Sequence, residues 1–387
     1  MSEPPSSHPL SELAGLFLRL GTTAFGGPAA HIGFMEDEVV RRRQWMTRQQ
    51  FLDLVGATNL IPGPNSTEMA IHIGYLRAGW PGLIVAGTCF IVPAALMVGA
   101  LAWVYVTYGR LPQATALLYG VKPVVFAIVV QAMWRLARAA VKTRVLAAAG
   151  LAALALAVAG ISELAILAAA GCALGFTRAR RAIPITILAA ISLFTLAAVF
   201  LPVSLLAQRP AAVTSSILFL YFAKIGSVLY GGGYVLLAFL QTDLVTRWHW
   251  LTSHQLLDAV AVGQITPGPL FTTATFIGYV LAGPAGAASA TAGIFLPAFF
   301  FCTISGPIVP RIRQSATAGA FLDGVNVASL ALMGAVTWAL AQAAIVDIPT
   351  IVLAAAAAVV VFRTRINSGW LVLAGAAIGL LLSWRSF

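Results

Sequence analysis

The chain is organised as long apolar runs separated by short polar and basic segments. Five runs, at residues 80–108, 114–134, 183–207, 283–305 and 318–343, approach or exceed the ~20 residues that a membrane-spanning helix requires. Four shorter runs, at 145–160, 162–176, 349–362 and 369–383, suit thin or tilted spans or a packed hairpin. The pattern predicts an all-α integral membrane protein.

Four further segments, at 12–34, 51–76, 214–240 and 256–280, are interrupted by Gly-Gly or Pro-Gly-Pro and belong to an internal repeat. Residues 17–64 align with 222–269 without a gap and are identical at about one position in three, and the register continues past one deletion. We therefore expect a polar tail at 1–11, a first repeat at 12–182, a linking transmembrane helix at 183–210 and a second repeat at 211–387. A duplicated half in a membrane chain is typical of a transporter.

Composition and charge support the membrane assignment and add orientation. The chain is 60% hydrophobic and only 9% charged, whereas soluble domains carry roughly 25% charged residues. The net charge of +11 comes from clusters between the apolar runs, which indicates topology and argues against a nucleic-acid partner. The loop at 35–50 holds Arg41, Arg42, Arg43 and Arg48, but the matching loop at 241–255 keeps only Arg247. Because positive loops face the cytoplasm, we expect inverted repeats.

The Pro-Gly-Pro sequences carry the predicted binding chemistry. Each proline lacks an N–H group, so a helix that reaches Pro62 has to stop and restart after Pro64. Irregular backbone at membrane depth needs protein or water partners, and a restarted helix offers its N-terminal amides to an anion. A single such kink would be ordinary, but the matched pair, carried by broken or re-entrant helices, favours a central anion site. The substrate-binding candidates are Gly26, Gly27, Pro62, Gly63, Pro64, Asn65, Ser66, Thr67, Gly231, Gly232, Pro267, Gly268, Pro269 and Thr272.

Ionisable residues within the apolar segments are further candidates. Arg19 and Lys224 occupy the same repeat position and would suit a dianion, although a snorkelling anchor is the alternative. Lys122 is a third cation whose contact with substrate stays open. Glu68 and His72 lie four residues apart on one helix face, where they would carry a coupling proton or form a structural pair.

Other polar residues predict structural roles. Asp53 and Asp258 match at the starts of broken segments, where a carboxylate typically caps a helix. The three cysteines, Cys89, Cys172 and Cys302, are isolated inside apolar runs and predict neither a metal site nor a disulfide. We expect no cofactor.

Several of these motifs together resemble one family. They are Phe25-Gly26-Gly27-Pro28 with His31, the stretch from Asn59 to Pro64 followed by Ile73-Gly74-Tyr75, and in the second half Gly231-Gly232, Gln264 to Pro269 and Phe276 to Tyr279. This set, in order and over nearly the whole chain, resembles the chromate ion transporter family in its long, two-domain form. The resemblance implies a multi-pass inner-membrane protein that exports chromate and confers chromate resistance, and that is not an enzyme. It leaves sulfate as a related anion and homodimerisation open.

Three departures and two alternatives qualify the resemblance. Gly233 stands where the first half has Pro28, Leu236 where it has His31, and Gln264 where it has Asn59. The halves are therefore not expected to be equivalent. The transported anion could be sulfate or another small anion. A membrane lipid-pyrophosphate phosphatase is a remote alternative, because the stretch from Pro62 to Thr67 is similar to that family's Pro-Gly-x-Ser-Arg-Ser. Here no arginine follows to bind phosphate and no acidic cluster follows to bind metal.

Overall fold

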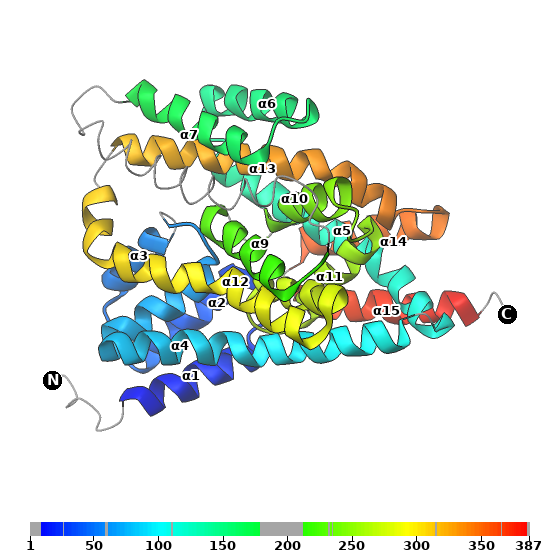
Figure 1. Ribbon diagram of the computed structural model, residues 1–387, viewed down its shortest axis with the longest axis horizontal. Helices are drawn as coiled ribbons and strands as arrows, with labels where there is room; N and C mark the ends of the chain where they lie inside the picture. The colour runs from blue at the N-terminus through cyan, green and yellow to red at the C-terminus, as the bar shows by residue number, and fades with distance from the viewer. Residues whose placement is uncertain are drawn as a thin grey trace.

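The computed structural model describes residues 9–25, 27–58, 61–109, 111–178, 212–230, 233, 235–313, 316–364 and 366–384, and within them the secondary structure is entirely helical (Figure 1). The first half contains α1 (Pro9–Thr23), α2 (Gly27–Glu36), the π-helix η1 (Asp37–Arg42), α3 (Arg48–Thr58), α4 (Asn65–Tyr108), α5 (Pro112–Ala140), α6 (Arg144–Val158) and α7 (Glu163–Arg178). The second half contains α9 (Ser215–Val228), α10 (Leu236–Leu240), the π-helix η2 (Gln241–Arg247), α11 (Ser253–Ile265), the short 3-10 helix η3 (Leu270–Thr272), α12 (Thr273–Arg313), α13 (Ala316–Ala344), α14 (Ile348–Arg363) and α15 (Ser368–Trp384). Apart from η3, the described elements follow the same order in the two halves.

The predicted helical membrane class is confirmed. Within the described residues, α4, α5, α12 and α13 are each long and apolar enough to cross a membrane, and they contain the predicted runs at 80–108, 114–134, 283–305 and 318–343. The shorter predicted runs correspond to the apolar helices α6, α7, α14 and α15. The predicted span at 183–207, within the linking segment 183–210, lies outside the described residues.

The long helices α4 and α12 are helical hairpins and not straight rods. In α4 the backbone leaves the helical region at Ala78 and Gly79, where Gly79 has a φ of +60°. A Cβ built on Gly74 would overlap the carbonyl oxygen of Gly82, although residues eight apart in a straight helix are separated by about 12 Å along the axis. The short arm at 65–77 therefore folds back on the long arm at 80–108. Ala282 and Gly283 make the same reversal in α12.

Equivalent turns precede the broken helices in both halves. Gln44 and His249 hold the same repeat position, and both have positive φ, 50° and 53° respectively. Each turn is followed by a capping box in which a threonine and the glutamine three residues later exchange hydrogen bonds. The pairs are Thr47 with Gln50 before α3 and Thr252 with Gln255 before α11. The backbone entering each broken segment is thus fixed by the same local chemistry twice.

The two halves are interlocked by exchanged helices. The α6 and α7 hairpin of the first half packs on α13 of the second half, as Figure 1 shows. Reciprocally, α14 and α15 of the second half pack on α5 of the first. Neither half therefore packs as an independent body, and the largest apolar core contains residues of both halves.

The equivalent helices α4 and α12 pack on each other in opposite directions. A Cβ built on Gly87 would lie 2.5 Å from the ring of Phe299. Further along α4, Gly99 faces Thr275, whose hydroxyl lies 2.7 Å from that of Thr291. As residue numbers rise along α4, those of its neighbours in α12 fall, and Figure 1 shows the same opposed courses. The approximate two-fold axis that relates the halves is consequently perpendicular to these helices.

Candidate functional site

The two Pro-Gly-Pro segments each bind the opposite half of the protein. The N–H group of Gly63 donates to the carbonyl oxygen of Leu229 at 2.8 Å, and that of Gly268 donates to the carbonyl oxygen of Ala24 at 3.0 Å. Gly63 and Gly268 are repeat equivalents, and so are Ala24 and Leu229, which lie at the ends of α1 and α9. We call this reciprocal pair of hydrogen bonds the inter-repeat clamp. It places both non-helical segments at the junction between the halves.

The chain leaves the helical conformation at both Pro-Gly-Pro sequences and restarts at once. Asn65 begins α4, and Ser66 and Thr67 in its first turn are buried. In the second half η3 begins after Pro269, and the hydroxyl of Thr272 donates to the carbonyl oxygen of Pro269 at 2.8 Å. Both restarted helices therefore begin in buried positions beside prolines that carry no donor.

The clamp also uses two of the predicted anion donors. The amides of Gly63 and Gly268 are already bonded across the junction, so an anion at these segments would depend on the following residues. Gly27, with a φ of +75°, begins α2. The remaining candidate glycines, Gly26, Gly231 and Gly232, lie outside the described residues.

The predicted cations Arg19 and Lys224 each meet a carboxylate. Arg19 forms an ion pair with Glu38, which also contacts Arg42 at 3.2 Å. Lys224 lies 3.5 Å from Asp243, which also accepts a hydrogen bond from Arg247 at 2.9 Å. The members correspond one to one in the repeat, so we call them the first-half ion cluster (Arg19, Glu38, Arg42) and the second-half ion cluster (Lys224, Asp243, Arg247). Both acids lie on a π-helix, a local form often found at functional sites.

The acids of these clusters, Glu38 and Asp243, are not among the residues predicted from the sequence, although the internal repeat contains a signal for them. Glu38 and Asp243 align at the same ungapped offset as the cations that they bind. A matched acid beside a matched cation would have indicated two paired clusters. Burial acts to raise the pKa of Glu38, but hydrogen bonds from Arg19 and Arg43 outweigh it, and the net pKa lies below the usual value. Glu38 is therefore held as a carboxylate.

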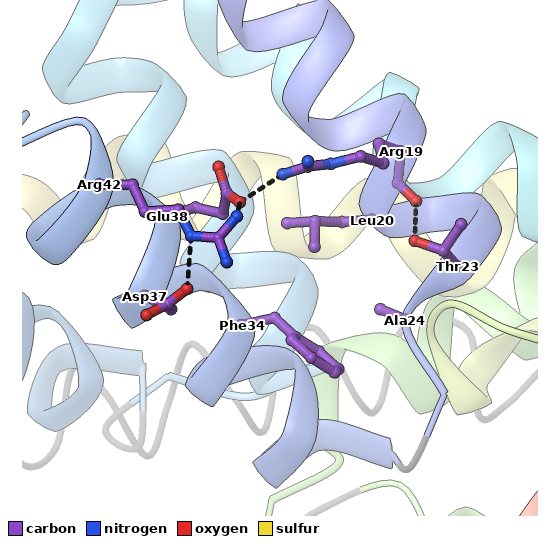
Figure 2. A pocket seen from close by; sticks show the side chains of 8 residues that line it. All are labelled: Arg19, Leu20, Thr23, Ala24, Phe34, Asp37, Glu38 and Arg42. Atoms are coloured by element: carbon purple, nitrogen blue, oxygen red, sulfur yellow. Dashed lines mark hydrogen bonds and ion pairs between the residues drawn. The ribbon is translucent and has the colours of Figure 1, made fainter.

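The two ion clusters differ in exposure. The Arg19 side chain is 50% exposed and borders a cavity of about 270 Å³. Figure 2 shows Arg19 and Arg42 converging on Glu38 beside this cavity, with Phe34 and Thr23 also lining it. In the second half the Lys224 side chain is only 8% exposed.

An aromatic cover explains the closed second-half cluster. The Lys224 ammonium lies 5.9 Å from the centre of the Tyr221 ring, and that ring packs on Trp248 at 5.0 Å. The repeat equivalents of these two aromatics are Leu16 and Arg43, which offer no such cover. The same cluster is thus open in one half and sealed in the other.

Lys122 belongs to a separate polar contact between three helices. Its Nζ lies 3.4 Å from a carboxylate oxygen of Asp258 in α11, and the hydroxyl of Tyr105 in α4 donates to the other oxygen at 2.9 Å. In the first half, Asp53 instead accepts a hydrogen bond from Gln49 on an exposed turn. The second half offers Asn326 in place of Lys122. Asp258 therefore balances the charge of the partly buried Lys122, a role that the repeat does not share.

Glu68 and His72 lie in the short arm of α4, one turn apart. Glu68 is fully buried and His72 nearly so. Within the described part of the chain, neither carboxylate oxygen of Glu68 has a hydrogen-bond partner, and the same holds for Nε2 of His72. The second half has Thr273 at the position of Glu68 and no histidine nearby. The pair is a feature of the first half.

Comparison with known proteins assigns this architecture to a family. A sequence profile described as "Chromate transporter" matches residues 11–207 and again 216–380. The chain belongs to the chromate transporter family. The family is one of transporters, and with the apolar helices described above it makes the chain an integral, multi-pass membrane protein.

Individual relatives agree with the family assignment. The chain is 35% identical to a chromate transport protein of Cupriavidus metallidurans, over 96% of this chain and 92% of that protein. It is 32% identical to a chromate transport protein of Pseudomonas aeruginosa, over 90% and 84% of the two chains. It is 30% identical to a probable chromate transport protein of Synechococcus elongatus, over 89% and 88%. No solved structure matches.

Proposed function

We propose that the protein is a secondary transporter that exports chromate across the inner membrane and so confers chromate resistance. The chain matches relatives named chromate transport protein over most of their length, and this supports chromate as the substrate. The observation that carries the proposal is the inter-repeat clamp, in which Gly63 bonds Leu229 and Gly268 bonds Ala24. Irregular backbone at the junction of two repeats is where transporters of this architecture bind their substrates.

The substrate path in this proposal runs between the two halves. The anion is held by the first residues of the restarted helices, Asn65 to Thr67 and Thr272, with Arg19 and Lys224 supplying positive charge on either side. Both cations are paired with acids in this conformation, so an anion would replace a carboxylate as the partner of each. Chromate and sulfate are tetrahedral dianions and both fit this description.

Alternation follows from the antiparallel packing of α4 and α12. If these helices cross the membrane, an axis perpendicular to them lies in the membrane plane, and the repeats are inverted. The two ion clusters would then lie toward opposite faces, and the arms at 65–77 and 273–281 would be re-entrant. The open first-half cluster and the sealed second-half cluster describe one of two conformations. In the other conformation, movement of one half against the other would lift the Tyr221 and Trp248 cover from Lys224 and close access to the first-half cluster, and alternation between the two conformations would carry the anion across.

Flux measurements with purified protein in liposomes test the proposal. Labelled chromate and labelled sulfate are supplied separately, and wild-type protein is expected to move chromate faster than protein-free liposomes do. Gly63→Leu should abolish the flux, because a side chain at this φ of +139° meets the Glu68 carboxylate. Gly15→Leu, whose new side chain enters open space on α1, is the control and should transport normally. If the protein moves sulfate alone, its substrate is sulfate and not chromate. If it moves neither anion, the proposed transport function is wrong.

A further inference from the structure

Glu68 lies in a closed space between the two halves. Its Oε1 is so close to Gly63 that a Cβ there would lie 2.5 Å away, which means that the Pro-Gly-Pro segment covers the carboxyl group. On the other side is α12, where the Cys302 sulfur lies 3.9 Å from the backbone carbonyl oxygen of Glu68. Ala298 of α12 packs against the same glycine. The exposed fraction of the whole Glu68 residue is 0%, so its carboxyl group is shielded from solvent.

No cation compensates this carboxyl group within the described residues. Three other buried acids, Glu38, Asp243 and Asp258, each have a lysine or arginine within 3.5 Å. The titratable groups that face Glu68 are Tyr230, which follows α9, and Cys302, with His72 one turn along its own helix. None of them forms an ion pair or a hydrogen bond with its carboxylate oxygens.

An ionised carboxylate in this place would be severely unfavourable. The effective cost of burying an unpaired ion is several kcal/mol, and a buried acid avoids it by taking up a proton. The neutral carboxylic acid is therefore the form that this conformation accommodates. Loss of that proton would require water or a cation to reach the carboxyl group, and this requires the segment held by Gly63 and Leu229 to move.

We propose that Glu68 is the proton-binding site that couples anion transport to the proton gradient, an inference that rests on the proposed transport function. A proton from water on one side of the membrane binds a carboxylate oxygen of Glu68, is carried while the clamp segment covers it, and returns to water on the other side. No bond of the anion changes. Because the second half has Thr273 at this position, each cycle carries one proton at this site.

The first test is infrared spectroscopy on the purified full-length protein in lipid. Wild-type protein should show the carbonyl stretch of a protonated carboxylic acid near neutral pH, and Glu68→Gln should lack that band. Glu163→Gln is the control at a second buried acid, and its spectrum should keep the band that Glu68→Gln lacks. An unchanged band in Glu68→Gln would overturn the proposal, and this result does not depend on which anion the protein moves.

The second test separates net transport from exchange in liposomes. Glutamine mimics the protonated acid, so Glu68→Gln should lose chromate flux driven by a pH gradient while still exchanging labelled for unlabelled chromate. Glu68→Asp should keep gradient-driven flux. Gradient-driven flux in Glu68→Gln equal to wild type would refute proton coupling at this residue, and so would equal loss of exchange and net flux in a folded protein. If wild-type protein moves neither chromate nor sulfate, the transport proposal fails, and the infrared result alone decides whether Glu68 binds the proton.

Discussion

Removal of the acid from each ion cluster should destabilise the two halves unequally. In the second half, Asp243→Asn removes the carboxylate that pairs with Lys224, whose side chain is only 8% exposed. In the first half, Glu38→Gln leaves Arg19, whose side chain is 50% exposed and free to extend into the neighbouring cavity. The positions are repeat equivalents, so each variant is the control for the other.

The expected difference follows from burial. Breaking a buried ion pair by removing one partner costs about 3–5 kcal/mol, because the remaining charge stays buried. Exposed pairs contribute about 0–1 kcal/mol. Arg247 is 44% exposed and can also turn to solvent, so the loss in the second half comes from Lys224. Asp243→Asn should therefore lower the free energy of unfolding by roughly 2–5 kcal/mol more than Glu38→Gln.

Reversible unfolding in mixed detergent micelles measures both variants against wild type. The double variant Lys224→Met with Asp243→Asn removes the stranded charge and should recover most of the loss. Equal destabilisation by Asp243→Asn and Glu38→Gln, or no recovery in the double variant, would show that the aromatic cover of Tyr221 and Trp248 does not isolate Lys224 from water.

Three further predictions concern the hairpin, the open cluster and pH. Gly74→Ala should prevent correct folding, because the new Cβ overlaps the carbonyl oxygen of Gly82, whereas Gly15→Ala should leave the yield of folded protein unchanged on size-exclusion chromatography. Arg19→Gln should raise the KM for the anion in liposome flux, with Arg19→Lys milder, and an unchanged KM in both would make Arg19 a structural anchor. The pKa of Glu38 is lowered in the folded protein, so its stabilisation is present above the pKa of the unfolded carboxyl group and is lost as pH falls through the folded pKa. The difference in unfolding free energy between wild type and Glu38→Gln should accordingly shrink on acidification, and a constant difference would contradict this assignment.

The repeat made much of the architecture predictable. Because the alignment is ungapped from 17 to 64, it located equivalent breaks, and it placed Arg19 and Lys224 at one position. The pattern of apolar residues indicated two separate segments at 51–76 and 80–108. The chain does reverse between them, at Ala78 and Gly79. These features are local, so periodicity and turn residues carry them.

The contacts between the halves were beyond prediction from sequence. The inter-repeat clamp joins Gly63 to Leu229 through backbone atoms, so no residue type in the sequence indicates this contact. The exchange of α7 and α15 between the halves depends on tertiary packing and not on the composition of either helix. The pairing of Lys122 with Asp258 is also tertiary, and its position near a helix start predicted only a capping role for Asp258. Whether Arg19 and Lys224 bind substrate stays a prediction.

Alternating access between the two ion clusters depends on inverted halves, and thiol accessibility shows whether the halves are inverted. Gln49 and His254 are repeat equivalents, exposed and helical, and so avoid the positive φ of the preceding turns. Single cysteines are introduced at these positions in a background lacking Cys89, Cys172 and Cys302, and an impermeant thiol reagent is applied to intact cells and to inverted vesicles. The positive-inside rule predicts that the arginine-rich loop with Gln49 faces the cytoplasm. The cysteine at Gln49 should then react only in inverted vesicles, and that at His254 only in intact cells. Reaction of both from the same side would contradict inversion and remove the symmetry on which alternation between the two ion clusters depends.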